Sequence, residues 1–570
     1  MDTYSVPEEA AKVLFEGIIN NPLHANSPSE VKEAAKHIKY LGSSEPTLPI
    51  NWRFAESIAA IKGFQGSMLN VLLKKKYGLS YQQIVINTDH AQLFIASPLL
   101  LVLDPLGAKI RFGANTEEFY KYYPDGDKYH AMDGSPFKMA ATNIYKTKDG
   151  RFYHLHASMN SAPTEKALDL DASAATGLSY GEACQVYQEK ALQYTAAEIE
   201  NLMNDEYRQA GTTCWSIEEY RASEHGKANA HVGLYEVHHI PNPKQTPSWW
   251  KPVEGKTSPS RPLFGLKIVD LTRIIASPTI TRELAELGAS VMRITSPNVT
   301  DHTSLCADMG WGKWNAYLDL TQPQHRERLK ELILDADIVV DGYRPGVMAK
   351  WGFGKDDILK MFENSPKGII YVHENCYGWN GPWSHRSGWQ QISDANCGIS
   401  LEFGRAMGND EPVTPILPNS DFCTGAAGAV GVLEALITKA EKGGSYVIDV
   451  ALNYYSQWLA NSCSTYPEDV WKRVWSDKQN KIVFRHTDNM MVTIPRMLQP
   501  LVAEQSIIFS DEYFEVRQNG AIGVPVYTVK PILGFPQGTV KLGYNVGSRG
   551  NGVDAPRWPE NLLEEIVAQT

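Results

Sequence analysis

An aspartate at the start of a glycine-bearing helix is the residue of this chain best placed to do chemistry. The stretch NSDFCTGAAGAVGVLEALI, residues 419–437, predicts a packed core helix with Asp421 in its first turn and glycines at positions 425, 428 and 431. As an N-cap, Asp421 would accept free backbone N–H groups. As a nucleophile, it would form a covalent intermediate. The glycines would then let a ligand or another backbone come close.

Other nucleophiles and metal ligands are less favoured by their surroundings. The seven cysteines contain no C-x-x-C pair, which argues against a disulfide framework or a zinc knuckle. Cys423 is expected in the core. His154 and His156 alternate on one predicted strand, but no third ligand is evident and a solvated face is expected. His238 and His239 would point to opposite sides of a strand, so no metal site is predicted.

Strands and helices that alternate after residue 262 must position Asp421. Helices with apolar periodicity separate the predicted strands LKIVDLT, SVMRIT, DIVVDGY and GIIYVHEN. This order implies right-handed crossovers and a parallel sheet. The fold class is therefore α/β, with a Rossmann-like large domain. The loop RIIASP lacks the G-x-G-x-x-G pattern that brings backbone close to a pyrophosphate, so NAD is not expected.

Composition shifts divide the chain into five segments. ATNIYKTKDGRFYHLHA predicts a hairpin with Asp149 and Gly150 in its turn, and residues 241–262 are rich in Pro, Ser, Thr and Lys. The segments are a helical first part at 1–125, a small α+β domain at 126–240, a linker at 241–262, the parallel-sheet domain at 263–465, and a strap at 466–570 that returns to the large domain.

An internal echo links the two halves of the chain. Residues 63–85 resemble residues 428–447, since each has a glycine-bearing helix, a lysine-containing turn and a strand. Ten residues before the matched glycines, Gly66 and Gly431, stand Glu56 and Asp421. The chain therefore contains two partial copies of one unit.

Composition excludes some partners. The net charge is −11 and no lysine or arginine block is long enough to follow a phosphate backbone, so nucleic acid is not an expected partner. No run of about 18 apolar residues predicts a membrane span. The acidic amino terminus lacks an apolar h-region and AQT is not a peroxisomal address. A cytoplasmic location is expected.

Five segments in order resemble the family III CoA-transferases of the CaiB/BaiF type, which include formyl-CoA transferase, carnitine CoA-transferase and α-methylacyl-CoA racemase. They are PLFGLKIVDLTRIIASP, LAELGASVMRI, AYLDLTQPQHRERLKELILDADIVVDGYRPGVMAKWGFG, IIYVHENCYGWNGPW and NSDFCTGAAGAVGVLEAL. In that family two chains interlock, and each active site lies between the large domain of one subunit and the small domain of the other. The resemblance implies a fused two-copy, pseudo-dimeric chain with one complete site, which could dimerise further.

The resemblance also implies a reaction and a set of site residues. Asp421 matches the catalytic aspartate, which attacks an acyl-CoA to give a mixed anhydride and then an aspartyl thioester, from which an acceptor carboxylate receives CoA. Coenzyme A is thus a substrate, and no metal or NAD is implied. The implied CoA-binding residues are Arg273, Ile274, Arg293, Lys313, Arg344 and Lys350. The implied substrate-pocket residues are Ile275, Trp389, Gly134 and Gly425.

Departures from the family pattern keep alternatives open. The racemases carry a histidine where this chain has Trp389, and His385 lies four residues away. A glutamine and two basic positions common in transferases are Ile275, Trp314 and Ser296 here. The leading expectation is CoA transfer between unidentified carboxylic acids. The alternatives are an acyl-CoA racemase or isomerase, a repurposed enzyme acting on another carboxylic or polyketide-like substrate, and a non-catalytic acyl-CoA-binding scaffold.

Overall fold

The computed structural model describes residues 4–124, 134–173, 175–478 and 481–569. Its largest sheet has seven strands in the order β10-β9-β8-β11-β12-β13-β7. Six of them are mutually parallel, and β7 pairs antiparallel with β13 at one edge. The strands are β7 (Glu236–Ile240), β8 (Lys267–Leu271), β9 (Ser290–Thr295), β10 (Lys313–Tyr317), β11 (Ile338–Asp341), β12 (Ile370–Asn375) and β13 (Ser445–Ala451). The predicted α/β class is confirmed.

Helices cover both faces of this sheet, because alternate strand residues point to opposite sides. One core joins α13 (Ala276–Glu286) and α19 (Asn419–Lys442) to strand residues such as Ile268 and Ile448. A second core lies on the opposite face, beneath α15 (Pro323–Asp335) and α16 (Lys355–Met361). Each of the four strands predicted after the linker is present. The helices α17 (Gln390–Asn396) and α18 (Ile399–Ala406) follow β12 and precede α19.

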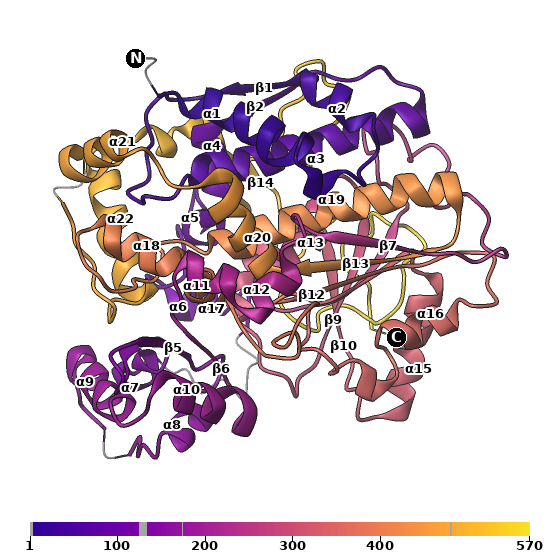
Figure 1. The fold of residues 1–570 in the computed structure, drawn as a ribbon. Helices are drawn as coiled ribbons and strands as arrows, with labels where there is room; N and C mark the ends of the chain where they lie inside the picture. Colours follow the sequence, from indigo (N-terminus) through magenta and orange to yellow (C-terminus); the bar gives the residue numbers. More distant parts are fainter. Residues whose placement is uncertain (1–3, 125–133, 174, 479–480, 570) are drawn as a thin grey trace.

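A small unit forms a separate lobe below the main body (Figure 1). Its antiparallel sheet has the order β4-β5-β6, and the predicted hairpin turn lies between the first two strands, where Gly150 has φ +80°. The predicted small domain extended to residue 240, whereas β7 belongs to the large sheet. The lobe's elements are β4 (Asn143–Lys146), β5 (Phe152–His156), β6 (Ala210–Thr213), α7 (Pro136–Ala140), α8 (Ala162–Ala167), α9 (Tyr180–Ala191) and α10 (Ala196–Glu200). The predicted boundary at 125/126 lies outside the described residues.

The first part of the chain packs against α19 through the long helix α3 (Phe54–Tyr77). Beside α3 lies a two-stranded parallel sheet of β1 (Ile38–Leu41) and β2 (Ile84–Asn87). A Cβ added at Gly66 of α3 would lie 3.0 Å from Ile84 of β2, and one at Gly431 of α19 would lie 3.0 Å from Ile448 of β13. The two glycines therefore bring a helix close to a strand in matching ways.

The segment after residue 465 contacts every other part of the chain. The strands β14 (Phe514–Arg517) and β15 (Val526–Val529) form a sheet with β3 (Val102–Leu103). The helix α22 (Met490–Ala503) begins after Asn489, whose side-chain amide donates to Met139 O in the small unit. Farther on, Asp554 N donates to Asn315 O of β10 at 2.8 Å. The segment thus contacts the small unit as well as the large sheet.

Shorter helices complete the described part of the chain. They are α1 (Val6–Lys12), α2 (Val31–Ala34), α4 (Thr88–Leu93), α5 (Ser97–Leu100), α6 (Thr116–Phe119), α11 (Ile217–Ala222), α12 (Glu224–Asn229), α14 (Cys306–Met309), α20 (Leu452–Trp458) and α21 (Glu468–Lys472). Among the described residues, α19 is the one helix long and apolar enough to cross a membrane, and 89% of its most apolar window is buried inside the protein. Core helices of soluble proteins meet the same criterion.

Candidate active site

Asp421 lies in the first turn of α19, at the edge of the sheet where the parallel strands end. Ligands of open α/β sheets bind at this edge. The helix begins at Asn419, and the residue at its N-cap position is Pro418, so the interpretation of Asp421 as the N-cap is wrong. Its side chain is half-buried, and within the described residues its carboxyl makes no side-chain hydrogen bond or ion pair. It is therefore free to react with a ligand.

Two other carboxyl groups surround Asp421. Burial, together with the charges of Glu374 at the end of β12 and Asp394 on α17, raises the pKa of Asp421 well above its usual range. Burial likewise raises the pKa of Glu374 and that of Asp394 to about 7. The Ser277 hydroxyl donates to Glu374 at 2.8 Å. Neither residue was predicted from the sequence, although the place of Glu374 near the carboxyl end of a predicted parallel strand would have indicated it.

The small unit meets this edge of the sheet through Trp389, the N-cap residue of α17. Its indole N–H donates to Ser158 Oγ at 3.0 Å, and its ring stacks on His156 with 5.2 Å between centroids. On the other side, Cys376 Sγ donates to Trp389 O at 3.5 Å, and the nearby Asp421 carboxylate is one cause of the raised pKa of Cys376, after burial. Trp389 thus contacts both the small unit and Cys376, whose thiol lies close enough to Asp421 to sense its charge.

The sequence predicted a solvated face for His154 and His156, but both side chains are buried. Their residues are 1% and 6% exposed, because β5 packs where the small unit meets the main body. Burial lowers the pKa of His154 to about 4 and that of His156 to about 3. Both rings are therefore neutral at pH 7. His156 Nε2 pairs with the side-chain oxygen of Gln391 at 3.1 Å.

Two of the predicted CoA-binding cations lie together on the loops that follow β8 and β11. The Arg273 guanidinium stacks over the Tyr343 ring at 5.1 Å and donates to Thr300 O at 2.6 Å. Arg344 is exposed and reaches Ser158 Oγ of the small unit at 3.3 Å. Partial loss of solvation and the neighbouring charge of Arg273 lower the pKa of Arg344. This like-charged pair can accept an anion. Lys350 is exposed on the same stretch after β11.

Two other predicted CoA-binding residues are already paired inside the protein. Arg293 of β9 forms a buried ion pair with Asp301 at 2.7 Å. Lys313 of β10 donates to Asp270 at 3.0 Å and to Pro278 O at 2.9 Å, and burial lowers its pKa to about 8. Both side chains point from a strand into the protein interior and are already paired there, which disfavours the prediction that they bind phosphates. Their carboxylate partners could not be identified from local sequence patterns.

Glycine serves packing rather than a ligand at position 425. A Cβ there would lie 2.5 Å from Ala276 O and 2.4 Å from Thr279 Cβ of α13. The glycine therefore brings α19 close to another helix, which favours a packing role over the predicted place in the substrate pocket. Gly134 is exposed before α7, with φ +77° and open space where a Cβ would be.

The loop between β8 and α13 is strained at Ile274. This residue has φ +72°, a conformation that a β-branched side chain rarely adopts. Ile274 and Ile275 are half-buried between the Arg273 side chain and the start of α13. Strain of this kind is concentrated at functional sites. It fixes the backbone immediately after the Arg273 cation.

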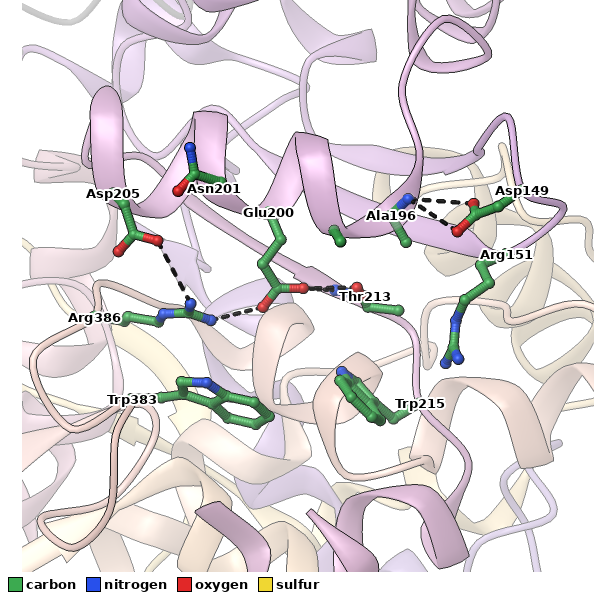
Figure 2. A pocket seen from close by; sticks show the side chains of 11 residues that line it. Asp149, Arg151, Ala196, Glu200, Asn201, Asp205, Thr213, Trp215, Trp383 and Arg386 are labelled. Carbon is green, nitrogen blue, oxygen red and sulfur yellow. Dashed lines mark hydrogen bonds and ion pairs between the residues drawn. The ribbon is translucent and has the colours of Figure 1, made fainter. Parts of the chain in front are cut away.

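A hollow of about 390 Å³ lies on another part of the seam between the small unit and the main body (Figure 2). Arg386, on the loop before α17, pairs with Glu200 of α10 at 2.6 Å and approaches Asp205 at 3.9 Å. Trp383 and Trp215 form one wall. The lining contains none of the predicted site residues. Its ion pairs instead hold the small unit against the large sheet, a role that the sequence did not reveal.

Comparisons with known proteins point to one family. The model of the family described as CoA-transferase family III matches residues 263–485. Acetyl-coenzyme A transferase nodX of Hypoxylon pulicicidum is 49% identical over 565 residues, which cover 99% of this chain and 95% of that protein. An acyl-CoA transferase of Gibberella moniliformis is 32% identical over 474 residues, covering 80% of this chain and 79% of that protein.

A solved structure resembles part of the chain. The CAIB/BAIF family protein from Brucella suis is 25% identical, with a TM-score of 0.32, and the match covers 35% of this chain and 55% of that one. The relationship of the chain as a whole rests on the relatives that match most of its length. With 49% identity over 99% of its residues, the chain belongs to the CoA-transferase family III and is a transferase enzyme.

Proposed function

We propose that this protein transfers CoA between carboxylic acids through a covalent intermediate on Asp421. The observation that carries the proposal is the half-buried Asp421 carboxyl at the start of α19, which has no side-chain hydrogen-bonding partner among the described residues. A structural carboxylate would be paired or capping. This one is left for a ligand.

The reaction proceeds by four exchanges of acyl bonds. The ionised Asp421 carboxylate attacks the thioester carbonyl of the donor, which gives a mixed anhydride and releases CoA thiolate. The thiolate attacks the aspartyl carbonyl, so the donor acid leaves and Asp421 becomes a CoA thioester. The acceptor carboxylate then attacks this thioester and releases the thiolate. Attack of the thiolate on the acceptor's acyl carbon forms the new acyl-CoA and restores Asp421.

The protein's own groups supply the electrostatics of these steps. Asp421 sits in the first turn of α19, where the helix dipole and free backbone N–H groups favour an anion or a developing oxyanion. Arg273 and Arg344 are placed to bind phosphate groups of CoA, since guanidinium groups match phosphate geometry. The name of the relative that matches 99% of the chain supports acetyl-CoA as donor.

We also infer that the chain is a fused pair of trimmed copies with a single working site. The strand order of β8 to β13 is that of a Rossmann-like layer, and it would belong to the second copy. In the first copy, α3 and β2 would match α19 and β13. Glu56, the counterpart of Asp421, is fully buried and accepts hydrogen bonds from the Tyr4 hydroxyl at 2.5 Å and the Tyr466 hydroxyl at 3.0 Å. It has no open face for a substrate.

Racemisation is less well supported by this geometry. That chemistry needs two bases on opposite faces of the α-carbon. His385, the histidine nearest in sequence to Trp389, has a side chain that is 66% exposed and lies 4.0 Å from Asp205. It is therefore directed to the seam hollow rather than to Asp421.

The proposal is tested by trapping the intermediate. Wild-type protein and the Asp421→Asn variant are incubated with acetyl-CoA, treated with hydroxylamine, and analysed by intact-mass and peptide mass spectrometry. We expect an aspartyl hydroxamate at position 421 in the wild type and none in the variant. An unlabelled wild type that still transfers CoA would refute the covalent route.

A further inference from the structure

Four side chains with metal-binding atoms lie side by side on the β7 edge of the large sheet. Glu236 and His238 are two residues apart on β7, so they share a face. Asp449 of β13 is paired with Glu236, and His373 of β12 is paired with Asp449. Paired residues point to the same side, so all four side chains belong to one face of three adjacent strands.

The ligand atoms are close enough for one ion. One such atom from each of Glu236, His238 and Asp449 lies within 4.8 Å of the other two. His238 Nε2 is 3.1 Å from Asp449 Oδ2, and His373 Nε2 contacts Asp449 Oδ1. A tetrahedral ion with bonds of about 2.1 Å needs ligands about 3.4 Å apart. Small side-chain rotations would bring the three ligand atoms, which lie within 4.8 Å of one another, to this spacing.

Surrounding groups orient the four side chains. Glu236 Oε2 accepts from the Tyr454 hydroxyl at 2.8 Å and from the Asn380 amide at 3.1 Å. The His373 ring stacks on Trp379 with 3.6 Å between centroids. Supporting contacts of this kind hold metal ligands in place in many proteins. Solvent can reach the cluster from the side of His238, whose side chain is 46% exposed.

We propose that Glu236, His238 and Asp449 bind a divalent transition-metal ion such as Zn²⁺. His373 either supports Asp449 through its other carboxylate oxygen or serves as a fourth ligand. Two imidazoles and two carboxylates form a nitrogen and oxygen set that suits Zn²⁺, Co²⁺ or Ni²⁺ better than Ca²⁺ or Mg²⁺. The two carboxylates also balance the charge of the ion.

Such a site would be structural and separate from the site at Asp421. The neighbouring residue on β12, Glu374, points to the opposite face of the sheet, where its charge acts on Asp421. The proposed ion would instead fasten β7, from the first half of the chain, to β13 in the second half. The inference is independent of the proposed transfer reaction.

The test uses tag-free protein, because a polyhistidine tag would bind the same ions. The protein is freed of metal with a chelator, dialysed against Zn²⁺ and analysed for bound zinc, and titrated with Co²⁺ while visible absorption is recorded. The variants are His238→Ala and Asp449→Asn. His239→Ala is the matched control, since this exposed histidine is adjacent on β7 but points to the other face.

We expect one zinc per chain in the wild type and in His239→Ala, with Co²⁺ absorption typical of nitrogen and oxygen ligands. Affinity should fall at least tenfold in His238→Ala and Asp449→Asn. Zinc should raise the melting temperature of the wild type and the control by a few degrees, but not that of His238→Ala. Equal zinc binding by the wild type and His238→Ala, or no zinc on the wild type, would overturn the proposal. Circular dichroism verifies that the variants fold.

Discussion

Burial and the charge of Glu374, near the end of β12, raise the pKa of Asp421 in the first turn of α19. A carboxyl must be ionised to attack a thioester, so this relationship controls the reactive form of Asp421. Because its pKa is raised, Asp421 becomes ionised only at a higher pH than an ordinary aspartate. Transfer should therefore be slow in acid and accelerate as pH rises.

Removal of the Glu374 charge should shift the pH profile to lower pH. The Glu374→Gln variant keeps an oxygen that can accept from Ser277 but has no negative charge beside Asp421. The acid limb of kcat/KM against pH should then move down by at least half a pH unit. Glu327→Gln, an exposed carboxylate on α15, is the control and should leave the profile in place. A Glu374→Gln profile identical to that of the wild type would exclude the electrostatic coupling.

Arg273 and Arg344 should contribute to CoA affinity. Loss of one hydrogen bond from a charged group costs about 1.5–3 kcal/mol, or roughly ten- to hundredfold in affinity. We expect Arg344→Gln to weaken CoA binding by about tenfold, because Arg344 is partly solvated. Isothermal titration with CoA measures the change, and Arg328→Gln on the surface of α15 is the control. Unchanged affinity in Arg273→Gln and Arg344→Gln would rule out this phosphate site.

Side-chain volume at position 425 should destabilise the protein. In Gly425→Val, the new Cβ would lie 2.5 Å from Ala276 O and 2.4 Å from Thr279 Cβ. Both distances are too short, so α13 and α19 must separate. Overpacking of this kind typically costs about 1–3 kcal/mol. The melting temperature should fall by several degrees. Gly181→Ala in α9 meets open space and should leave it unchanged. A stable Gly425→Val variant would show that this position is not a packing site.

Glu56 should be dispensable for turnover. Its carboxyl is enclosed by Tyr4, Tyr466 and Arg53, whereas Asp421 is half-buried at the sheet edge. Glu56→Gln should retain wild-type kcat within about twofold, while Asp421→Asn should lose roughly a thousandfold or more. Steady-state assays of both variants, after circular dichroism has verified folding, make the comparison. Loss of turnover in folded Glu56→Gln would contradict a single working site.

The sequence predicted the parallel sheet well because its signals are local. Short apolar strands alternate with periodic helices after residue 262, and each of the four predicted strands is present between β8 and β12. The edge strand β7 was missed, since an antiparallel partner more than 200 residues away leaves no local signal. The pairing of Glu236 with Asp449 in the sheet was missed for the same reason.

The site residues were predictable only where position along a strand decided their place. Asp421 was predicted from its place at the start of a glycine-bearing helix, and the loops after β8 and β11 were implied by the family resemblance; all of them lie at the carboxyl ends of parallel strands, where ligands bind. Arg293 and Lys313 could not be distinguished from surface cations, because burial depends on the partners Asp301 and Asp270 that folding supplies. A glycine such as Gly425 can admit either a ligand or a neighbouring helix, and only the folded structure shows that α13 packs against it.

The central claim is that Asp421 carries the acyl exchange, and oxygen transfer tests it most directly. If acetyl-CoA is the donor, released acetate must be able to return by the reverse of the same steps. The protein is therefore incubated with acetyl-CoA and ¹⁸O-labelled acetate, acetyl exchange is followed in the same sample, and the peptide that contains Asp421 is analysed by mass spectrometry. We predict exchange with ¹⁸O incorporated at Asp421. Exchange without label at Asp421, or exchange that persists in Asp421→Asn, would contradict the account.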